Sequence, residues 1–344
     1  MTQSADQAYL RTRLAIMRSR LFSQSEIEAL TELSLDALLK RLDLQVAREL
    51  PHEHMLDRFE QGLLQIWLDE LSTLLRPLHG AKRNILVQWA RRYELFNLKA
   101  LIRGKLSGQP VKEIRDSLFR LPGFLSLNHD RLLQTDDVAD LLRQLDHTPY
   151  GSIAHQAQRR FAEHQDQFLL DASLDQFFYT ELSRHISSLE PTDQGEMNEM
   201  VGRIVDRHNI VWMLRYRYNY SLSPAEALYL SIDHGLTLGK AERTILAEQP
   251  SFETFLEHLP ETLKNQLKGV DNIVQVESRL KQDLAVYANR VMRFSPSIVA
   301  AVYSYLILRY YEINALFAIV HARLMGLDNK LLFEALQPDR REAA

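Results

Sequence analysis

The sequence contains no cysteine and few of the residues that interrupt helices. Without cysteine the chain has no disulfide, no thiolate metal ligand and no thiol nucleophile. Only 12 glycines and 11 prolines occur among 344 residues, and Leu, Ala, Glu, Gln and Arg fill the stretches between them. No segment alternates β-branched and polar residues between two turns. These absences predict a fold that is nearly all α-helical.

Long hydrophobic runs and an excess of one charge are also missing. The longest stretch without a charged residue, 294–308, has 15 residues, whereas a membrane-spanning helix needs about 20 apolar residues. The 41 basic residues are nearly balanced by 45 acidic ones, which argues against a protein that binds nucleic-acid phosphates over a large surface. We therefore expect no bilayer-spanning segment and no nucleic-acid partner. The polar residues 1–9 give no indication of an export signal.

What the sequence does contain is an internal repeat. Three amphipathic segments, 93–105, 205–217 and 311–323, begin near an acidic residue and end with a basic one. The first two carry asparagine three residues after the acid, whereas Ala315 takes this place in the third and Asn314 is displaced by one residue. The repeated residues are Glu94, Asn97 and Lys105, then Asp206, Asn209 and Arg217, and finally Glu312 and Arg323.

Flanking features recur with the same period, because the repeated acids are 112 and 106 residues apart. A long amphipathic stretch (51–76, 160–189 or 270–293) and then a helix breaker precede each segment. The breakers are Pro77 and Gly80, Pro191 and Gly195, and Ser295 with Pro296. The chain is therefore predicted to form three pseudo-equivalent helical units, 1–115, 116–228 and 229–344, the third being the divergent copy.

The repeated polar residues allow two interpretations. On a helix the acid, the asparagine and the terminal base share one largely apolar stripe. Asn97 and Asn209 are therefore expected to be buried and hydrogen-bonded to backbone groups within their own units. Arg103, Arg215 and His321 point the other way, and the alternative is that these three residues line a shared surface for a partner.

Patterns typical of catalysis or metal binding are weak. Residues 235–240 (Gly-Leu-Thr-Leu-Gly-Lys) have the wrong glycine spacing for a phosphate-binding loop and follow no strand. Residues 52–54 (His-Glu-His) lack a third ligand at helical spacing. Glu26 and the pair Asp136-Asp137 lie at expected helix starts, where capping explains acidic residues. We expect no catalytic residue, no cofactor and no metal.

Together these features resemble a known family. The acid-x-x-Asn repeats, the opening segment 9–21, the Leu-Asp-x-Phe sequences at 56–59 and 174–177 and the Tyr-Glu-x-Asn sequence at 311–314 carry the resemblance. They resemble the C subunit of bacterial and archaeal V/A-type ATPases, the counterpart of the eukaryotic d subunit (the AC39 family). The resemblance extends over nearly the whole chain and departs from the family pattern after the displaced Asn314.

The resemblance implies a funnel of three helical units around a central cavity. It implies a non-catalytic coupling subunit that receives the rotor stalk subunits of the soluble motor and lies on the membrane proteolipid ring. Such a subunit is held at the cytoplasmic face of the membrane by protein contacts, carries torque for ATP-coupled proton or sodium transport, and is not expected to homo-oligomerise. Arg103, Arg215 and His321 are then candidates for polar lining of the cavity. The alternatives are an unrelated helical-repeat scaffold and a hydrolytic or metal enzyme whose site forms only in three dimensions.

Overall fold

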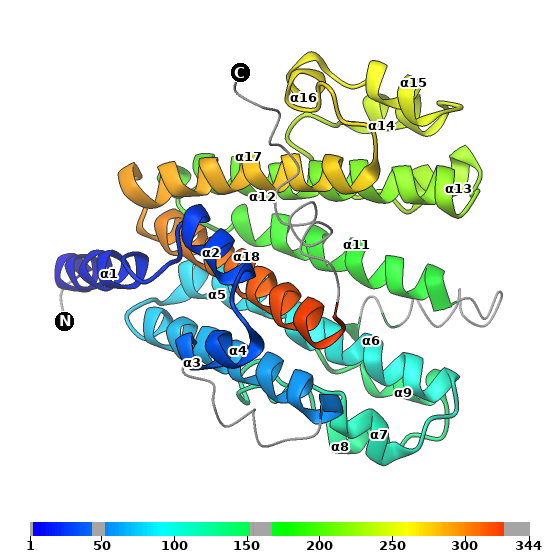
Figure 1. Cartoon of the computed structure of the whole chain (residues 1–344). Coiled ribbons are helices and arrows are strands. Elements are labelled where there is room, and N and C mark those ends of the chain that lie inside the picture. The colour runs from blue at the N-terminus through cyan, green and yellow to red at the C-terminus, as the bar shows by residue number, and fades with distance from the viewer. Residues whose placement is uncertain (1–2, 43–51, 152–153, 155–166, 327–344) are drawn as a thin grey trace.

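The computed structural model describes residues 3–42, 52–151, 154 and 167–326. All regular secondary structure in these ranges is helical, and no strand occurs in them (Figure 1). The prediction of an all-α fold is therefore confirmed. Within the same ranges, no helix is both long enough and apolar enough to cross a bilayer.

The frame of the molecule repeats one pattern of two long helices separated by a breaker. In the first copy the second helix is divided at Arg91, and in the second copy it continues into a π-helical turn, Arg215–Asn219. The long helices are α4 (His52–Leu75), α5 (Gly80–Ala90) with α6 (Arg92–Leu106), α11 (Gln167–Ile186), α12 (Pro191–Leu214), α17 (Ile273–Phe294) and α18 (Ile298–Leu324).

Short helices fill three further stretches of the chain. The N-terminal stretch forms α1 (Gln3–Arg18), α2 (Gln24–Thr31) and α3 (Leu35–Arg41). The stretch after α6 forms α7 (Val111–Asp116), α8 (His129–Leu133) and α9 (Val138–Gln144). The stretch after α12 forms α13 (Pro224–Tyr229), α14 (Lys240–Ala247), α15 (Phe252–Glu257) and α16 (Glu261–Gln266), and the last three lie at the top of Figure 1.

Local sequence signals explain where several of these helices begin. Pro191 occupies the first turn of α12, and the Ser297 hydroxyl caps α18 by accepting from the Ala300 N–H. Glu26 forms a capping box at the start of α2, and Asp137 is the N-cap of α9. The interpretation of these acidic residues as capping groups is confirmed.

The two long helices of each pair pack against helices of other pairs. Helix α11 packs on α5, α17 packs on α12, and α4 packs on α18. In the last of these contacts the Trp67 indole N–H donates to the Leu306 carbonyl at 3.4 Å, and Trp67 is fully buried. The first helix of each pair thus contacts the second helix of a different pair. The three contacts together form a closed cycle of pairs.

The N-terminal stretch packs against the last long helix. Helices α1, α2 and α3 all contact α18 (Figure 1). The Phe22 N–H donates to Glu312 Oε1 at 2.9 Å, and the Arg323 guanidinium donates to the Thr31 carbonyl. Residues at the beginning of the chain therefore supply the short helices that cover α18.

Candidate functional site

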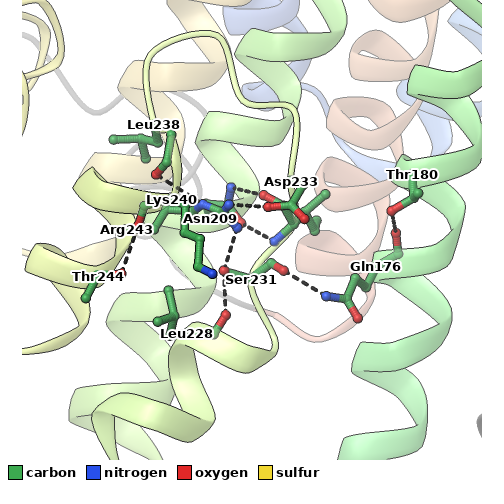
Figure 2. Close-up of polar contacts among 12 residues, drawn as sticks. Gln176, Thr180, Asn209, Leu228, Ser231, Asp233, Leu238, Lys240, Arg243 and Thr244 are labelled. Atoms are coloured by element: carbon green, nitrogen blue, oxygen red, sulfur yellow. Dashed lines mark hydrogen bonds and ion pairs between the residues drawn. The ribbon is translucent and has the colours of Figure 1, made fainter.

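Asn97 and Asn209 make the same pair of hydrogen bonds in two copies of the repeat. Asn97 Nδ2 donates to the Phe119 carbonyl at 2.9 Å, and its Oδ1 accepts from the Phe119 N–H at 2.8 Å. Asn209 binds the carbonyl and the N–H of Ile232 at 2.8 Å each (Figure 2). Both amides are buried. Each therefore holds the segment of short helices that follows its own long helix.

The repeated acids also bind chain segments next to their helices. Glu94 accepts from His129 Nε2, with carboxylate distances of 3.0 and 3.2 Å. Asp206 accepts from the N–H groups of Thr237 and Leu238 at 2.7 and 3.1 Å. In the third copy, Glu312 accepts from the N-terminal segment, as described above. All three acids are buried, and each carboxylate makes structural contacts within the chain.

The repeated bases complete the same arrangement. Lys105 Nζ donates to the carbonyls of Leu133 and Thr135 at 3.2 and 2.5 Å. Arg217 donates to the Leu222 carbonyl, and Arg323 donates to a carbonyl of α2. In each copy a basic side chain thus satisfies backbone carbonyls at the edge of the short helices. The geometry supports the interpretation that the repeated acid, amide and base lock helices together.

The glycine-rich segment 235–240 does bind an anion, and that anion is a carboxylate of the same chain. Its N–H groups point at Asp206, and a Cβ added to Gly235 would lie 2.2 Å from Asp206 Oδ1. Next to this loop, buried Arg243 donates to Ser231 Oγ at 2.7 Å and pairs with Asp233 (Figure 2). Because Asp206 accepts from the N–H groups of Thr237 and Leu238, these two donors are not available to a phosphate.

A cavity of about 1340 Å³ lies between the long helices. Its wall includes residues of α2, α11 and α17 and of all three of the repeated second helices, among them Arg92, His208 and Tyr310. Cavities of this size between helices are common sites of recognition. The cavity is therefore the candidate functional site.

The three residues predicted to line a shared surface lie in different places. Arg215 is on the cavity wall and pairs with Glu277 at 2.9 Å. Arg103 is exposed on α6, and His321 stacks on Phe317 with a centroid distance of 6.0 Å. Neither Arg103 nor His321 is among the residues lining this cavity. A role for the three as a lining for a partner stays a prediction.

Sequence reasoning missed the polar groups deepest in the cavity. Arg207 donates to Tyr311 Oη at 3.1 Å and to His208 Nε2 at 3.3 Å, and Tyr179 Oη is also hydrogen-bonded to His208 Nε2. Because Nε2 accepts from the guanidinium, it carries no proton. Burial and the neighbouring Arg207 charge hold the pKa of His208 well below its ordinary value. His208 is therefore neutral in the cavity.

Arg92 also lines the cavity, and its guanidinium group is stacked between aromatic rings. Its Cζ lies 3.1 Å from the Trp89 ring centroid and 4.4 Å from that of Tyr310. The signal available in the sequence was position: Arg92 and Arg207 lie within two residues of the repeated acids Glu94 and Asp206. Their convergence depends on the packing of α6 against α11 and of α12 against α17, which no local pattern encodes.

No metal centre is evident at this site or elsewhere in the described ranges. Among these residues no group of three or more His, Asp or Glu side chains is placed to hold a metal ion. The side chains of residues 52–54 (His-Glu-His), the weak metal-binding pattern of the sequence, lie outside the described part of the structure. The residues that line the cavity offer electrostatic attraction, hydrogen bonding and aromatic packing.

Comparison with known proteins identifies the family. Residues 10–332 match the family model described as ATP synthase (C/AC39) subunit. Similar proteins include the C subunit of the A-type ATP synthase of Methanosarcina mazei, which is 24% identical over 344 residues, 97% of this chain and 93% of that protein. The corresponding A-type ATP synthase protein of Haloferax volcanii is 24% identical (95% of this chain, 96% of that protein), and that of Haloquadratum walsbyi is 26% identical (79% and 80%). The resemblance seen in the sequence is therefore confirmed, and the chain belongs to the ATP synthase (C/AC39) subunit family.

Proposed function

We propose that the chain is a non-catalytic coupling subunit of a rotary A/V-type ATPase. In this proposal the central cavity receives the tip of the rotor stalk, and another face of the molecule rests on the membrane proteolipid ring. The chain then transmits torque between the two during ATP-coupled proton or sodium transport. It works as a peripheral subunit at the cytoplasmic face of the membrane, held by protein contacts. The family membership and the names of the relatives support this assignment.

The observation that carries the proposal is the composition of the cavity wall. Residues of the three repeated long helices share it: Arg92 from α6, His208 from α12 and Tyr310 from α18. His208 and Asn314, which also lines the cavity, occupy the same position two residues after the repeated acid. A wall built from three related helices suits a single shaft on the axis of the molecule.

The size of the cavity supports a helical occupant. An α-helix about 10 Å in diameter that rises 1.5 Å per residue takes up about 120 Å³ per residue. The cavity of about 1340 Å³ would therefore hold about three helical turns. A stalk that ends in a helix fits a space of this size.

The packing order supports three pseudo-equivalent units arranged around the cavity as a funnel. The contacts of α11 with α5, α17 with α12 and α4 with α18 form a closed cycle. We propose that α1–α3, although first in the chain, serve the third unit by covering α18. The boundaries 1–115, 116–228 and 229–344 stay a prediction, and in space the segment 3–42 would belong with the last of them.

The test is deletion of this chain from the complete complex. Membranes and soluble fractions from the deletion strain are assayed for ATP hydrolysis and for ATP-driven uptake of protons and of sodium, with the wild-type gene restored as the control. We expect the soluble motor to keep hydrolysing ATP while ATP-driven ion uptake is lost. ATP-driven transport that survives the deletion would refute the coupling role. Nucleotide turnover by the purified chain would refute its non-catalytic character.

A further inference from the structure

Basic side chains dominate the cavity wall, although the whole chain is slightly acidic. Seven Lys or Arg residues and two Glu residues line the cavity, in a chain with a formal net charge of −4. Both acids already have partners. Glu277 pairs with Arg215 at 2.9 Å and with Lys281 at 3.1 Å, and Glu312 pairs with Arg309. The wall therefore carries more positive than negative charge.

Arg92 and Arg207 are basic residues of the wall for which no salt bridge to an acid of the described part of the chain is found. Glu277, which pairs with Arg215 and Lys281, acts on Arg207 from a longer distance and helps to raise the pKa of its guanidinium. Arg207 donates to the neutral groups of Tyr311 and His208, and Arg92 lies over Trp89. Nη2 of Arg92 is buried and has no hydrogen-bond partner among the described residues. A buried donor of this kind indicates a missing acceptor.

The guanidinium groups of Arg92 and Arg207 both lower the pKa values of His208 and Tyr310. Burial lowers the pKa of His208, and Arg207 and Arg92 lower it further. Burial would raise the pKa of Tyr310, yet Arg92, a hydrogen bond from Asn314 and Arg207 bring it below the ordinary value. Both effects are those of a net positive potential at the cavity floor. Two guanidinium groups that act on the same neighbours, with Glu277 as the acid acting on Arg207, are typical of a binding site.

We propose that Arg92 and Arg207 bind carboxylate groups of an acidic α-helical segment that a protein partner inserts into the cavity. Guanidinium groups recognise carboxylates through paired N–H donors. The rings of Trp212 and Tyr310 on the wall can pack against the apolar side of such a helix. The overall negative charge of the chain disfavours a long polyanion such as a nucleic acid. The identity of the partner as the rotor stalk rests on the proposed function, whereas its acidic character rests on the cavity.

The first experiment measures the affinity of the full-length chain for the purified rotor stalk subunits at low and high salt. The test variant carries Arg92→Gln and Arg207→Gln together. The matched control carries Arg131→Gln and Arg143→Gln, which remove the same charge from exposed positions on α8 and α9. We expect binding to weaken about 30-fold or more in the test variant, with a smaller dependence on salt. The control should bind within about twofold of the wild type.

A second variant guards against an effect of misfolding. Arg92→Lys with Arg207→Lys keeps both charges but loses the paired donors. It should recover most of the salt-dependent affinity that the glutamine variant loses. Melting curves of all variants show whether the fold is retained. Equal weakening in the lysine and glutamine variants would contradict an electrostatic role.

The second experiment needs no stalk. Two of the three tryptophans, Trp89 and Trp212, line the cavity, and Trp67 is fully buried, so tryptophan emission reports cavity binding. Decaglutamate should change the emission of the wild type and not that of the glutamine variant, whereas decaglutamine should have no effect. Inorganic phosphate and citrate should bind much more weakly than decaglutamate.

The outcomes separate this inference from the proposed function. If the stalk binds the wild type and the glutamine variant equally, the inference is wrong while the coupling role stands. If decaglutamate binds through the two arginines but the stalk does not bind at all, the acidic-partner inference stands and the coupling role is wrong. If phosphate or citrate binds as tightly as decaglutamate, the site is one for small anions and the inference is wrong.

Discussion

Lys82 Nζ lies 3.0 Å from Asp193 Oδ2, and the other oxygen of this carboxylate accepts from Ser297 Oγ at 2.6 Å. Lys82 is in the first turn of α5, Asp193 in the first turn of α12, and Ser297 is the N-cap of α18. A single buried carboxylate therefore joins the starts of the three repeated long helices. This junction ties together the starts of helices whose later residues line the cavity.

Replacing Asp193 with Ala should destabilise the protein. The change leaves the buried Ser297 hydroxyl without its acceptor and Lys82 with Glu190 alone, and stranding a buried hydrogen-bonding group costs about 1–3 kcal/mol. Urea unfolding followed by circular dichroism measures the loss. The control is Glu190→Gln, because Glu190 lies 3.2 Å from the same ammonium but its side chain is 64% exposed. The control should lose less than about 1 kcal/mol, and equal losses would contradict a special role for Asp193.

Replacing Asn97 or Asn209 with Leu should lower stability in both copies by a similar amount. Each change strands one buried backbone N–H and one carbonyl, which costs about 1–3 kcal/mol. Asn198→Leu is the control, because Asn198 is exposed on the same helix as Asn209. It should change the free energy of unfolding by less than about 0.5 kcal/mol. A raised melting temperature for Asn97→Leu would show that the amide does not hold the following segment.

Gly235→Ala should destabilise the protein, whereas Gly195→Ala should not. The new methyl group at position 235 would collide with the Asp206 carboxylate and push it away from its backbone donors. Overpacking of this kind costs about 1–3 kcal/mol. Gly195 is exposed in α12, and an added Cβ there meets nothing within 4 Å, so helix propensity favours alanine by up to about 1 kcal/mol. Thermal melting of both variants checks the opposite signs.

His208 should make the stability of the protein fall at acidic pH. Its pKa in the folded state is well below the ordinary value of 6.5, so the unfolded chain binds a proton that the folded chain excludes. The resulting stability is present above about pH 6.5 and is lost as the pH falls below that value, by about 1.4 kcal/mol per pH unit. Urea unfolding at pH 7.5 and 5.5 measures this loss. His208→Gln keeps an acceptor for Tyr179 and should show a smaller loss, and an unchanged pH dependence would contradict the prediction.

The parts of the fold that could be predicted are those encoded locally. Pro191 marks a helix start because it acts on the residues beside it. The breaker Ser295-Pro296 also lies before a helix, but the cap of α18 is Ser297, two residues after Ser295. The position of Asn97 on an apolar stripe indicates a buried amide because an unpaired amide there would be costly. The Phe119 backbone as its partner could not be predicted, since nothing in the sequence of a turn identifies which amide will meet it.

The parts that could not be predicted depend on contacts between distant segments. Glu312 binds the Phe22 N–H across 290 positions, and such a contact leaves no periodic trace in the sequence. It also gives a physical reason for the divergence of the third copy. Where the first two copies hold a following segment through asparagine, the third holds a preceding segment through its acid, so Ala315 replaces the amide without loss. Arg92 and Arg207 meet only because three helices converge.

The packing of the first helices on the last long helix sets the order in which the chain can fold. Phe22 and Thr31 leave the ribosome early, yet their partners on α18 follow 290 and 292 residues later. The apolar side chains of Leu30 and Leu38, buried in the finished protein, are therefore exposed during most of translation. Contacts between residues so far apart in the sequence form slowly, and until they form, exposed apolar surfaces can cause aggregation. The packing of the first three helices can therefore be completed only after the last long helix has been synthesised.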